Sequence, residues 1–156
     1  MTTESSALLA IREAIAHASA SKEPLRIVGG DTKAFYGMPS HGTVLSTADL
    51  QGIVSYEPTE LVITAQAGTR LDELNAILAN QGQMLAFEPP SFGPASTIGG
   101  VVAAGLSGPR RAAAGSVRDF VLGAKLIDSH GQWLSFGGQV MKNVAGYDIA
   151  RLLTGS

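Results

Sequence analysis

Residues 94–108 read PASTIGGVVAAGLSG, a run of small side chains that leaves the backbone open to close approach. Hydroxyl groups stand beside its glycines, and the residues of interest are Pro94, Ser96, Thr97, Gly99, Gly100, Gly105, Ser107 and Gly108. Side chains this small fill a core poorly. They admit either neighbouring backbone, as in close helix contacts, or a flat and extended ligand. The segment by itself leaves both interpretations open.

Another glycine cluster, the first in chain order, lies nearer the N-terminus. Residues 29–37 read GGDTKAFYG and directly follow the apolar stretch Leu25–Val28. Glycine has no Cβ, so the chain can turn there and bring successive N–H groups to one point, where they bind a phosphate oxygen. Thr32 adds a hydroxyl donor and Lys33 a cation. The alternative is a plain tight turn after a strand.

This first cluster matches neither common phosphate-binding signature. It lacks the GxGxxG spacing of a Rossmann fingerprint, and no GK[ST] follows as in a P-loop. A dinucleotide has a diphosphate at its centre and needs contacts from separated loops. One such ligand would explain both glycine clusters, so the pair favours dinucleotide binding over two unrelated structural roles.

Composition excludes several classes of protein. The chain has 156 residues, 45% of them hydrophobic, which suits one domain with a core. It has no Cys, which excludes disulfides, thiolate catalysis and a Cys-bound iron–sulfur cluster or zinc ion in this chain. The net charge of -2 gives no electrostatic basis for nucleic-acid binding. The three His residues lack metal-ligand spacing, so we expect no metal site.

Hydrophobic periodicity predicts the order of helices and strands. We expect an N-terminal helix around Leu8, Ile11 and Ile15, a helix with Thr69 as N-cap, a buried stripe at Leu71, Leu74 and Leu78 and an end at Gly82, and a last helix over 146–153. We expect extended segments at Leu25–Val28, Val44–Ser46, Ile53–Tyr56, Leu61–Ala67, Met84–Phe87, Val117–Asp128 and Gln132–Phe136, the last two forming a hairpin. Hairpins mixed with helices favour the α+β class over a doubly wound sheet.

Several motifs together resemble a known family. They are GGDTK at 29–33, AGTRLDEL at 67–74, PASTIGG at 94–100, SVRDFVLGA at 116–124 and NVAGYDIARLLTGS at 143–156. In these the chain resembles FAD-binding domains of the vanillyl-alcohol oxidase and p-cresol methylhydroxylase (PCMH) type. More narrowly, the closing motif, which in full reads GQVMKNVAGYDIARLLTGS at 138–156, resembles the FAD-binding subunits of bacterial glycolate oxidases. The likeness covers the chain from about Leu25 to Ser156.

The resemblance implies a two-lobed α+β fold with FAD between the lobes. The smaller lobe would span residues 1–47 and the larger lobe residues 48–156, with a mixed or antiparallel sheet and flanking helices. It assigns cofactor contacts to Gly29, Gly30, Asp31, Thr32 and Lys33, to Pro94, Ser96, Thr97, Gly99 and Gly100, to Gly105, Ser107 and Gly108, and to Val117 and Val121. Some relatives tether FAD through a His in the first loop. Residues 29–37 contain none, and His41 lies beyond, so we expect non-covalent FAD.

The resemblance also implies an activity and partners. We expect an FAD-dependent oxidoreductase that oxidises a small 2-hydroxy acid such as glycolate, working with a second flavin subunit and an iron–sulfur subunit. The substrate-cap domain of the family is absent from this sequence. We therefore expect a piece of a subunit about twice as long, inactive alone, with its catalytic residues unknown. Arg110 and Arg111 are candidates for phosphate or carboxylate contact, or else a solvated basic turn.

Two other functions stay open at this stage. One is a structural or adaptor subunit that kept the fold and lost the cofactor, with its exposed apolar surface serving as an interface. The other is a nucleotide-binding module without redox chemistry. The N-terminus has no basic region before an apolar stretch, and no apolar run approaches the length of a membrane span. We expect a cytoplasmic protein, in peripheral contact with the inner membrane at most through partner subunits.

Overall fold

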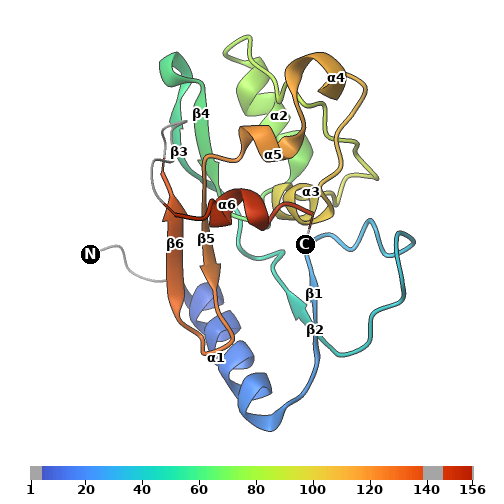
Figure 1. Cartoon of the computed structure of the whole chain (residues 1–156), viewed down its shortest axis with the longest axis vertical. Helices are drawn as coiled ribbons and strands as arrows, with labels where there is room; N and C mark the ends of the chain where they lie inside the picture. Colours follow the sequence, from blue (N-terminus) through green and yellow to red (C-terminus); the bar gives the residue numbers. More distant parts are fainter. Residues whose placement is uncertain (1–4, 139–145, 156) are drawn as a thin grey trace.

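The N-terminal segment forms the predicted helix. A computed structural model describes residues 5–138 and 146–155, and its first element is α1, Ser6–Ser21. The Ser5 hydroxyl caps the helix by accepting the N–H of Leu8 at 3.3 Å, which satisfies one of the free donors at a helix start. The helix buries Ile11 and Ala18, so the expected apolar face is confirmed. It lies beside the C-terminal hairpin in Figure 1.

The next two strands form a short parallel sheet. β1, Leu25–Val28, pairs with β2, Thr43–Ser46, in a register that joins Leu25 to Thr43 and Val28 to Ser46. Parallel neighbours need a long connection, and here residues 29–42 supply it. The first glycine cluster therefore begins where β1 ends, on a loop that projects away from the helices (Figure 1).

A hairpin and a helix follow. β3, Ile53–Glu57, pairs antiparallel with β4, Val62–Ala65, across the 3-10 turn η1, Pro58–Glu60. α2, Leu71–Ala79, buries Leu71, Leu74 and Leu78, as the helical spacing predicted. The prediction of Thr69 as its N-cap was wrong, because Arg70 holds that position without a side-chain cap. The helix also ends three residues before Gly82.

Three short helices lie within and after the second glycine segment, residues 94–108. They are α3, Ile98–Ala104, α4, Arg111–Ala114, and α5, Val117–Phe120. The central core lies under them and consists of Leu71, Phe87, Val101 and Val117, all at most 3% exposed. This core joins α2, α3 and α5. Through Val101 it fixes the part of the second glycine segment that forms α3.

The C-terminal hairpin corrects one prediction and confirms another. The long strand expected over Val117–Asp128 was wrong: its first part is α5, which the Ser116–Asp119 capping box starts, and only β5, Gly123–Ile127, is a strand. β5 pairs antiparallel with β6, Trp133–Gly137, as predicted.

The last described helix and one loop complete the fold. α6, Ile149–Leu152, packs against both strands of the C-terminal hairpin. It is shorter than expected, and residues 139–145 of the closing motif lie outside the described residues. The segment Met84–Phe87 forms a turn rather than the expected extended piece, with the Glu88 N–H bonded to the Leu85 carbonyl at 2.9 Å.

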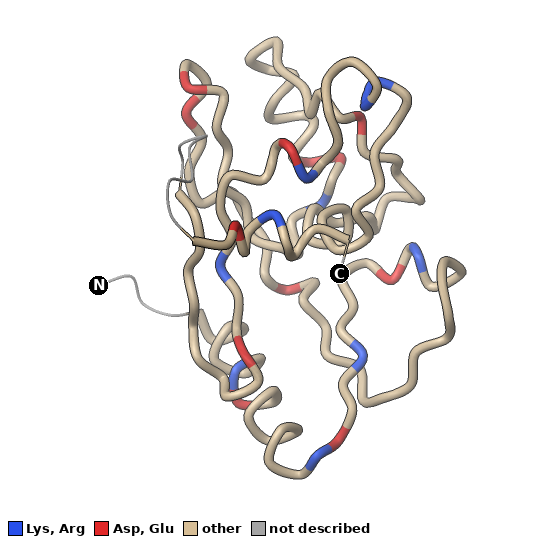
Figure 2. The backbone as a smooth tube through the Cα atoms, viewed as in Figure 1, with Lys and Arg blue, Asp and Glu red and all other residues tan. Residues whose placement is uncertain are grey.

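The α+β class is confirmed by these elements. Within residues 5–138 and 146–155, every sheet has two strands, and helices lie between them in the chain. Acidic and basic residues are spread along the backbone without a run of one sign (Figure 2). In the same part of the chain, no helix combines the length and apolar character needed to cross a membrane.

Candidate functional site

The loop after β1 presents a row of unpaired backbone donors. Within the described part of the chain, the N–H groups of residues 29–33 donate to no acceptor. The loop closes only further on, where the N–H of Ala34 reaches the Asp31 carbonyl at 3.3 Å and that of Tyr36 the Lys33 carbonyl at 2.9 Å. Backbone N–H groups are almost always paired unless water or a ligand takes them. Five successive donors of this loop are therefore open to water or to a ligand.

Asp31 is turned away from that surface by an ion pair. Its carboxylate accepts two hydrogen bonds from the Arg26 guanidinium, at 3.0 and 3.3 Å. Its backbone adopts the left-handed conformation, with φ at 52°. The carboxylate is thus committed to β1, and the loop offers donors rather than acceptors to a ligand.

Lys33 adds a cation without a counter-ion. Its ammonium lies 5.4 Å from the centre of the Phe92 ring, a cation–π contact, and no acidic side chain in the described residues pairs with it. Partial burial lowers the pKa of this amine below its ordinary value, because desolvation disfavours the charged form. An anion bound at the loop would supply the missing partner.

The two glycine clusters lie against each other. A Cβ added to Gly29 would collide with the Thr97 hydroxyl, and one added to Gly30 would collide with the Ala95 carbonyl. These glycines are therefore required by close packing of one loop on the other. The small-residue run at 94–97 therefore admits neighbouring backbone where it faces Gly29 and Gly30. The free N–H groups belong to residues 29–33.

The hydroxyls of the second segment are used inside the protein. Ser96, 1% exposed, accepts the N–H of Phe92 at 3.1 Å and lies 3.2 Å from the Thr32 hydroxyl. Thr97, 3% exposed, caps α3 by accepting the Gly100 N–H at 3.2 Å. Both side chains hold the shape of the segment and are buried away from solvent.

Backbone bonds fix this second segment to the chain before α2. The Leu71 N–H reaches the Ser96 carbonyl and the Ile98 N–H reaches the Thr69 carbonyl, each at 2.9 Å. The Arg70 guanidinium donates to the carbonyl of Pro94 at 2.8 Å. The segment 94–98 is thereby held like a strand against residues 69–71.

The two glycines of α3 differ in their surroundings. A Cβ on Gly99 would come 2.7 Å from the Ala67 carbonyl oxygen, which its own N–H already bonds at 2.8 Å. A Cβ on Gly100 would meet only the Thr97 hydroxyl at 3.2 Å and the Lys33 ammonium at 3.8 Å. Gly100 therefore faces the cation of the first loop, which brings residues 33 and 100 to one place.

The third predicted stretch has its own packing partners. Gly105 ends α3 with φ at 64°, and a Cβ there would lie 2.9 Å from the Gly155 Cα. Gly108 donates its N–H to the Phe87 carbonyl at 2.8 Å, and an added Cβ would collide with the Glu88 carbonyl. No contact joins this stretch to residues 29–33 among the interactions of the described residues.

The remaining predicted contacts lie at the core. Val117 is 1% exposed and belongs to the central core, and its N–H is bonded to the Ser107 hydroxyl at 2.9 Å. Val121 is partly buried and packs against that core. Their position relative to the first loop is set through α5 rather than by direct contact.

The arginine pair after the second segment lies in an exposed turn. The Arg110 guanidinium is 3.6 Å from a Glu88 carboxylate oxygen and donates to the Met84 sulfur at 3.3 Å, and Arg111 is exposed. Arg110 is thus an exposed side chain paired with Glu88, which favours the basic-turn interpretation. Asp148 caps α6 by accepting the Arg151 N–H at 3.1 Å, a structural role.

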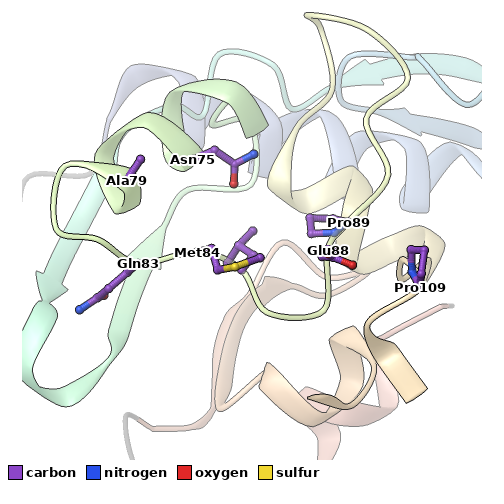
Figure 3. A pocket seen from close by; sticks show the side chains of 8 residues that line it. Asn75, Ala79, Gln83, Met84, Glu88, Pro89 and Pro109 are labelled. Atoms are coloured by element: carbon purple, nitrogen blue, oxygen red, sulfur yellow. The ribbon is translucent and has the colours of Figure 1, made fainter. Parts of the chain in front are cut away.

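Two shallow grooves lie away from the first loop. One, of about 480 Å³, is lined by Arg70, Asp72, Glu73 and Pro94. The other, of about 600 Å³, lies between α2 and the turn that follows it (Figure 3), and its lining residues are Asn75, Ala79, Gln83, Met84, Leu85, Glu88, Pro89 and Pro109. Residues 29–33 line neither of these two grooves.

Comparison with known proteins decides the family. A family described as "FAD binding domain" matches residues 8–137. The chain belongs to this family. The resemblance drawn from the motifs is confirmed, and so is the expectation of FAD as the cofactor.

Relatives of this FAD binding domain are longer enzymes. The chain is 54% identical over 147 residues to glycolate oxidase subunit GlcE of Escherichia coli, which covers 94% of the chain and 42% of that protein. It is 34% identical to glycolate oxidase subunit GlcD of Bacillus subtilis over 74% of the chain and 24% of that protein, and 30% identical to D-lactate dehydrogenase of Archaeoglobus fulgidus over 85% and 30%. The chain thus spans less than half the length of these relatives.

Solved structures share the fold of this FAD binding domain. An alkyldihydroxyacetonephosphate synthase superposes with a TM-score of 0.69 at 20% identity, over 94% of the chain and 29% of that protein. Phl p 4.0202, a glucose dehydrogenase, superposes with a TM-score of 0.67 at 16% identity, over 82% and 27%. The PCMH-type fold expected from the motifs is confirmed.

The residues of the first loop fit the cofactor of the family. FAD carries a diphosphate, and phosphate oxygens accept hydrogen bonds from backbone N–H groups and pair with cations. Residues 29–33 offer five free N–H groups and the unpaired Lys33 ammonium, and the one carboxylate of the loop is already bonded to Arg26. The donor set therefore suits a diphosphate.

Sequence reasoning missed the residues that hold the first loop and the second segment in place. They are Arg26, Phe92 and Arg70, which contact Asp31, Lys33 and Pro94 respectively. The only available signal was the opposite charge of Arg26 and Asp31 on either side of the Gly29-Gly30 pair. The other two contacts join distant parts of the chain, and no pattern in the sequence indicates them.

Proposed function

We propose that this chain binds FAD non-covalently, with the backbone N–H groups of residues 29–33 and the Lys33 ammonium holding the diphosphate. The observation that carries this proposal is the row of five unpaired donors beside a partly buried amine without a counter-ion. A cofactor-free adaptor has no need for either feature. The first loop contains no His and the chain no Cys, which favours a cofactor without a covalent tether.

The other predicted contacts divide into two roles within this proposal. Gly100 contacts the cofactor beside Lys33, because little stands between its Cβ position and that amine. Ser96 and Thr97 hold the second segment against the first loop, since their hydroxyls are buried and bonded. Val121, partly buried beside the core, is the candidate for contact with the adenosine half.

The rest of the second segment and the third stretch support these contacts. Pro94 and Gly99 fix the backbone of the second segment through their bonds to Arg70 and Ala67. The third stretch and the buried valine of α5 keep the fold around the cofactor, and these residues are Gly105, Ser107, Gly108 and Val117.

The reaction proposed for the whole enzyme is oxidation of a small 2-hydroxy acid such as glycolate. FAD, when bound, supplies the chemistry by accepting a hydride equivalent from the alcohol carbon. The part of this chain is to bind and orient the cofactor through the residues above. Support comes from the named activities of the relatives, which are glycolate oxidase subunits and D-lactate dehydrogenases.

Partners and organisation follow the same relatives. Two of them are named as subunits of glycolate oxidase, so we propose that this chain works in a complex with a second flavin subunit and an iron–sulfur subunit. Lobes spanning residues 1–47 and 48–156, with the cofactor between them, belong to this proposal. So does the cytoplasmic location.

Titration of the purified protein with FAD tests the proposal, with quenching of flavin fluorescence as the signal. Gly30→Val should abolish binding, because the new side chain drives the first loop off Ala95. Lys33→Gln should weaken it by about tenfold, the loss of one charge-assisted hydrogen bond. The matched controls are Gly138→Val, where an added Cβ meets nothing within 4 Å among the described residues, and Lys125→Gln, at an exposed lysine of β5; both should bind like the parent.

Four results would contradict the proposal. Folded Gly30→Val and Lys33→Gln proteins that bind FAD normally would remove residues 29–33 from the site. A parent protein that assembles with partners but never takes up flavin would favour the adaptor. ADP binding as tight as FAD binding would favour the nucleotide module. Flavin that stays with acid-precipitated protein would contradict the non-covalent attachment.

A further inference from the structure

Asp31 brings two unfavourable features to a diphosphate-binding loop. It carries the one acidic side chain of residues 29–37, next to the donors that would hold a dianionic group. It also has φ at 52°, the left-handed region that residues with a Cβ adopt at a cost. A loop built to bind an anion should avoid both, unless a neighbour compensates for them.

Arg26 compensates for both features at once. It lies two residues before the end of β1, and its two terminal nitrogens donate to the two carboxylate oxygens of Asp31 at 3.0 and 3.3 Å. The guanidinium neutralises the carboxylate, and the two parallel bonds fix its orientation. A side chain held in this way favours the one backbone conformation that places it there, which is the left-handed one.

We propose that Arg26 is a positioning residue for the cofactor diphosphate: by pairing with Asp31 it removes the negative charge from the loop and holds residues 29–33 in the conformation that exposes their N–H groups. This rests on the proposed function. Arg26 itself touches no cofactor atom in this account. Its effect reaches the ligand only through Asp31, and that dependence can be measured.

An ordinary surface ion pair would behave differently. Side chains of the pair are 27% and 46% exposed, and pairs this exposed contribute little to global stability. We therefore expect Arg26→Ala to change the unfolding midpoint in urea only slightly. Its effect on FAD affinity should be much larger, because the bare Asp31 carboxylate then repels the diphosphate and the loop loses its preferred shape.

A double-mutant cycle on the purified protein tests the dependence on Asp31. FAD affinity is measured by flavin fluorescence for the parent, Arg26→Ala, Asp31→Gly and the double variant, at 20 mM and 500 mM salt. Arg26→Ala should weaken binding by about tenfold at low salt and less at high salt, since salt screens the repulsion. Asp31→Gly should weaken binding less than Arg26→Ala does, because glycine carries no charge and adopts the left-handed conformation freely, although it lacks the ion pair that fixes the loop.

The double variant shows whether the effect of Arg26 on FAD affinity depends on Asp31. In the Asp31→Gly background, Arg26→Ala should have no effect on FAD affinity, and Arg26→Lys in the parent should restore part of the affinity through its charge. If Arg26→Ala weakens binding equally in both backgrounds, the effect of Arg26 does not depend on Asp31, and the proposal is overturned. If Arg26→Ala binds FAD like the parent at both salt concentrations, the proposal is overturned as well.

The Lys33→Gln and Gly30→Val variants separate this proposal from the one on which it rests. Loss of FAD binding in those variants together with an unaffected Arg26→Ala protein would remove the role of Arg26 and leave the site in place. Normal FAD binding in Lys33→Gln and Gly30→Val would remove the site, and the role of Arg26 with it.

Discussion

The hydroxyl oxygens of Thr32 and Ser96 lie 3.2 Å apart and join the two glycine-rich segments across 64 residues of sequence. Ser96 is 1% exposed and also accepts the N–H of Phe92 at 3.1 Å. One buried hydroxyl thus ties the first loop, the turn before the second segment and the second segment itself. The shape of the candidate site therefore depends on this buried side chain.

Ser96→Ala is therefore expected to destabilise the protein more than Thr32→Val. The alanine leaves the Phe92 N–H without its acceptor, which costs about 1–3 kcal/mol for a buried donor. The valine removes one hydroxyl contact and leaves the Phe92 bond intact, at a cost of about 1 kcal/mol. Urea unfolding measures both values, and equal losses would show that the Phe92 bond contributes nothing.

FAD binding should weaken as the pH rises through the pKa of Lys33. Burial lowers that pKa in the protein without ligand, so the amine loses its proton at a lower pH than an exposed lysine does. A bound diphosphate favours the charged amine, and affinity therefore falls above the lowered pKa. Lys33→Gln should lose this alkaline dependence of the FAD dissociation constant, and Lys125→Gln should keep it. The same fall in the Lys33→Gln protein would assign the dependence to another group.

The stability of the protein without cofactor should change in the opposite direction. Between the lowered pKa of Lys33 and the ordinary value of 10.5, the unfolded chain binds more protons than the folded one at this residue. The contribution of Lys33 to stability therefore rises with pH across that window. Comparing parent and Lys33→Gln unfolding in urea at several pH values isolates it.

The same local pattern succeeds at one helix start and fails at another. A hydroxyl residue followed three positions later by Asp occurs at Ser116 and again at Thr69. At Ser116 the capping box forms and begins α5. At Thr69 the buried hydroxyl instead bonds the N–H and the carbonyl of Gly52, at 3.0 and 3.1 Å, so the cap is lost to a contact 17 residues away. The sequence window around α2 holds no sign of that competition.

Elements set by local periodicity were predictable, and contacts between distant segments were not. The strand Leu25–Val28 and the buried leucines of α2 follow from patterns within a few residues. The glycine clusters stand out in the sequence, but Gly29 and Gly30 owe their identity to Thr97 and Ala95, which only the folded chain brings near.

Leu74→Ala should destabilise the protein strongly. Leu74 is 1% exposed on α2, and truncation of a buried leucine costs about 2–5 kcal/mol through lost transfer free energy and the cavity left behind. Leu152→Ala is the matched control, since Leu152 is 65% exposed on α6 and should change stability by less than about 0.5 kcal/mol. The urea midpoints of the two variants measure this difference in stability. Similar shifts in both would place Leu74 outside the core.

Gly105→Ala and Gly82→Ala form a pair that separates backbone strain from collision. Their φ values are 64° and 65°, so alanine meets the same cost of about 1–2 kcal/mol for the left-handed conformation at both positions. Among residues 5–138 and 146–155, nothing lies within 4 Å of a Cβ at Gly82, whereas one at Gly105 comes 2.9 Å from the Gly155 Cα. The Gly155 N–H is bonded to the Val102 carbonyl at 3.0 Å, so the collision must disturb that bond or the end of α3. Gly105→Ala should therefore lose about 1–3 kcal/mol more than Gly82→Ala in urea unfolding. Equal losses of stability would mean that the segment after α6 moves away from residue 105 without a loss of free energy. Its packing on α3 would then add nothing to the stability of the domain.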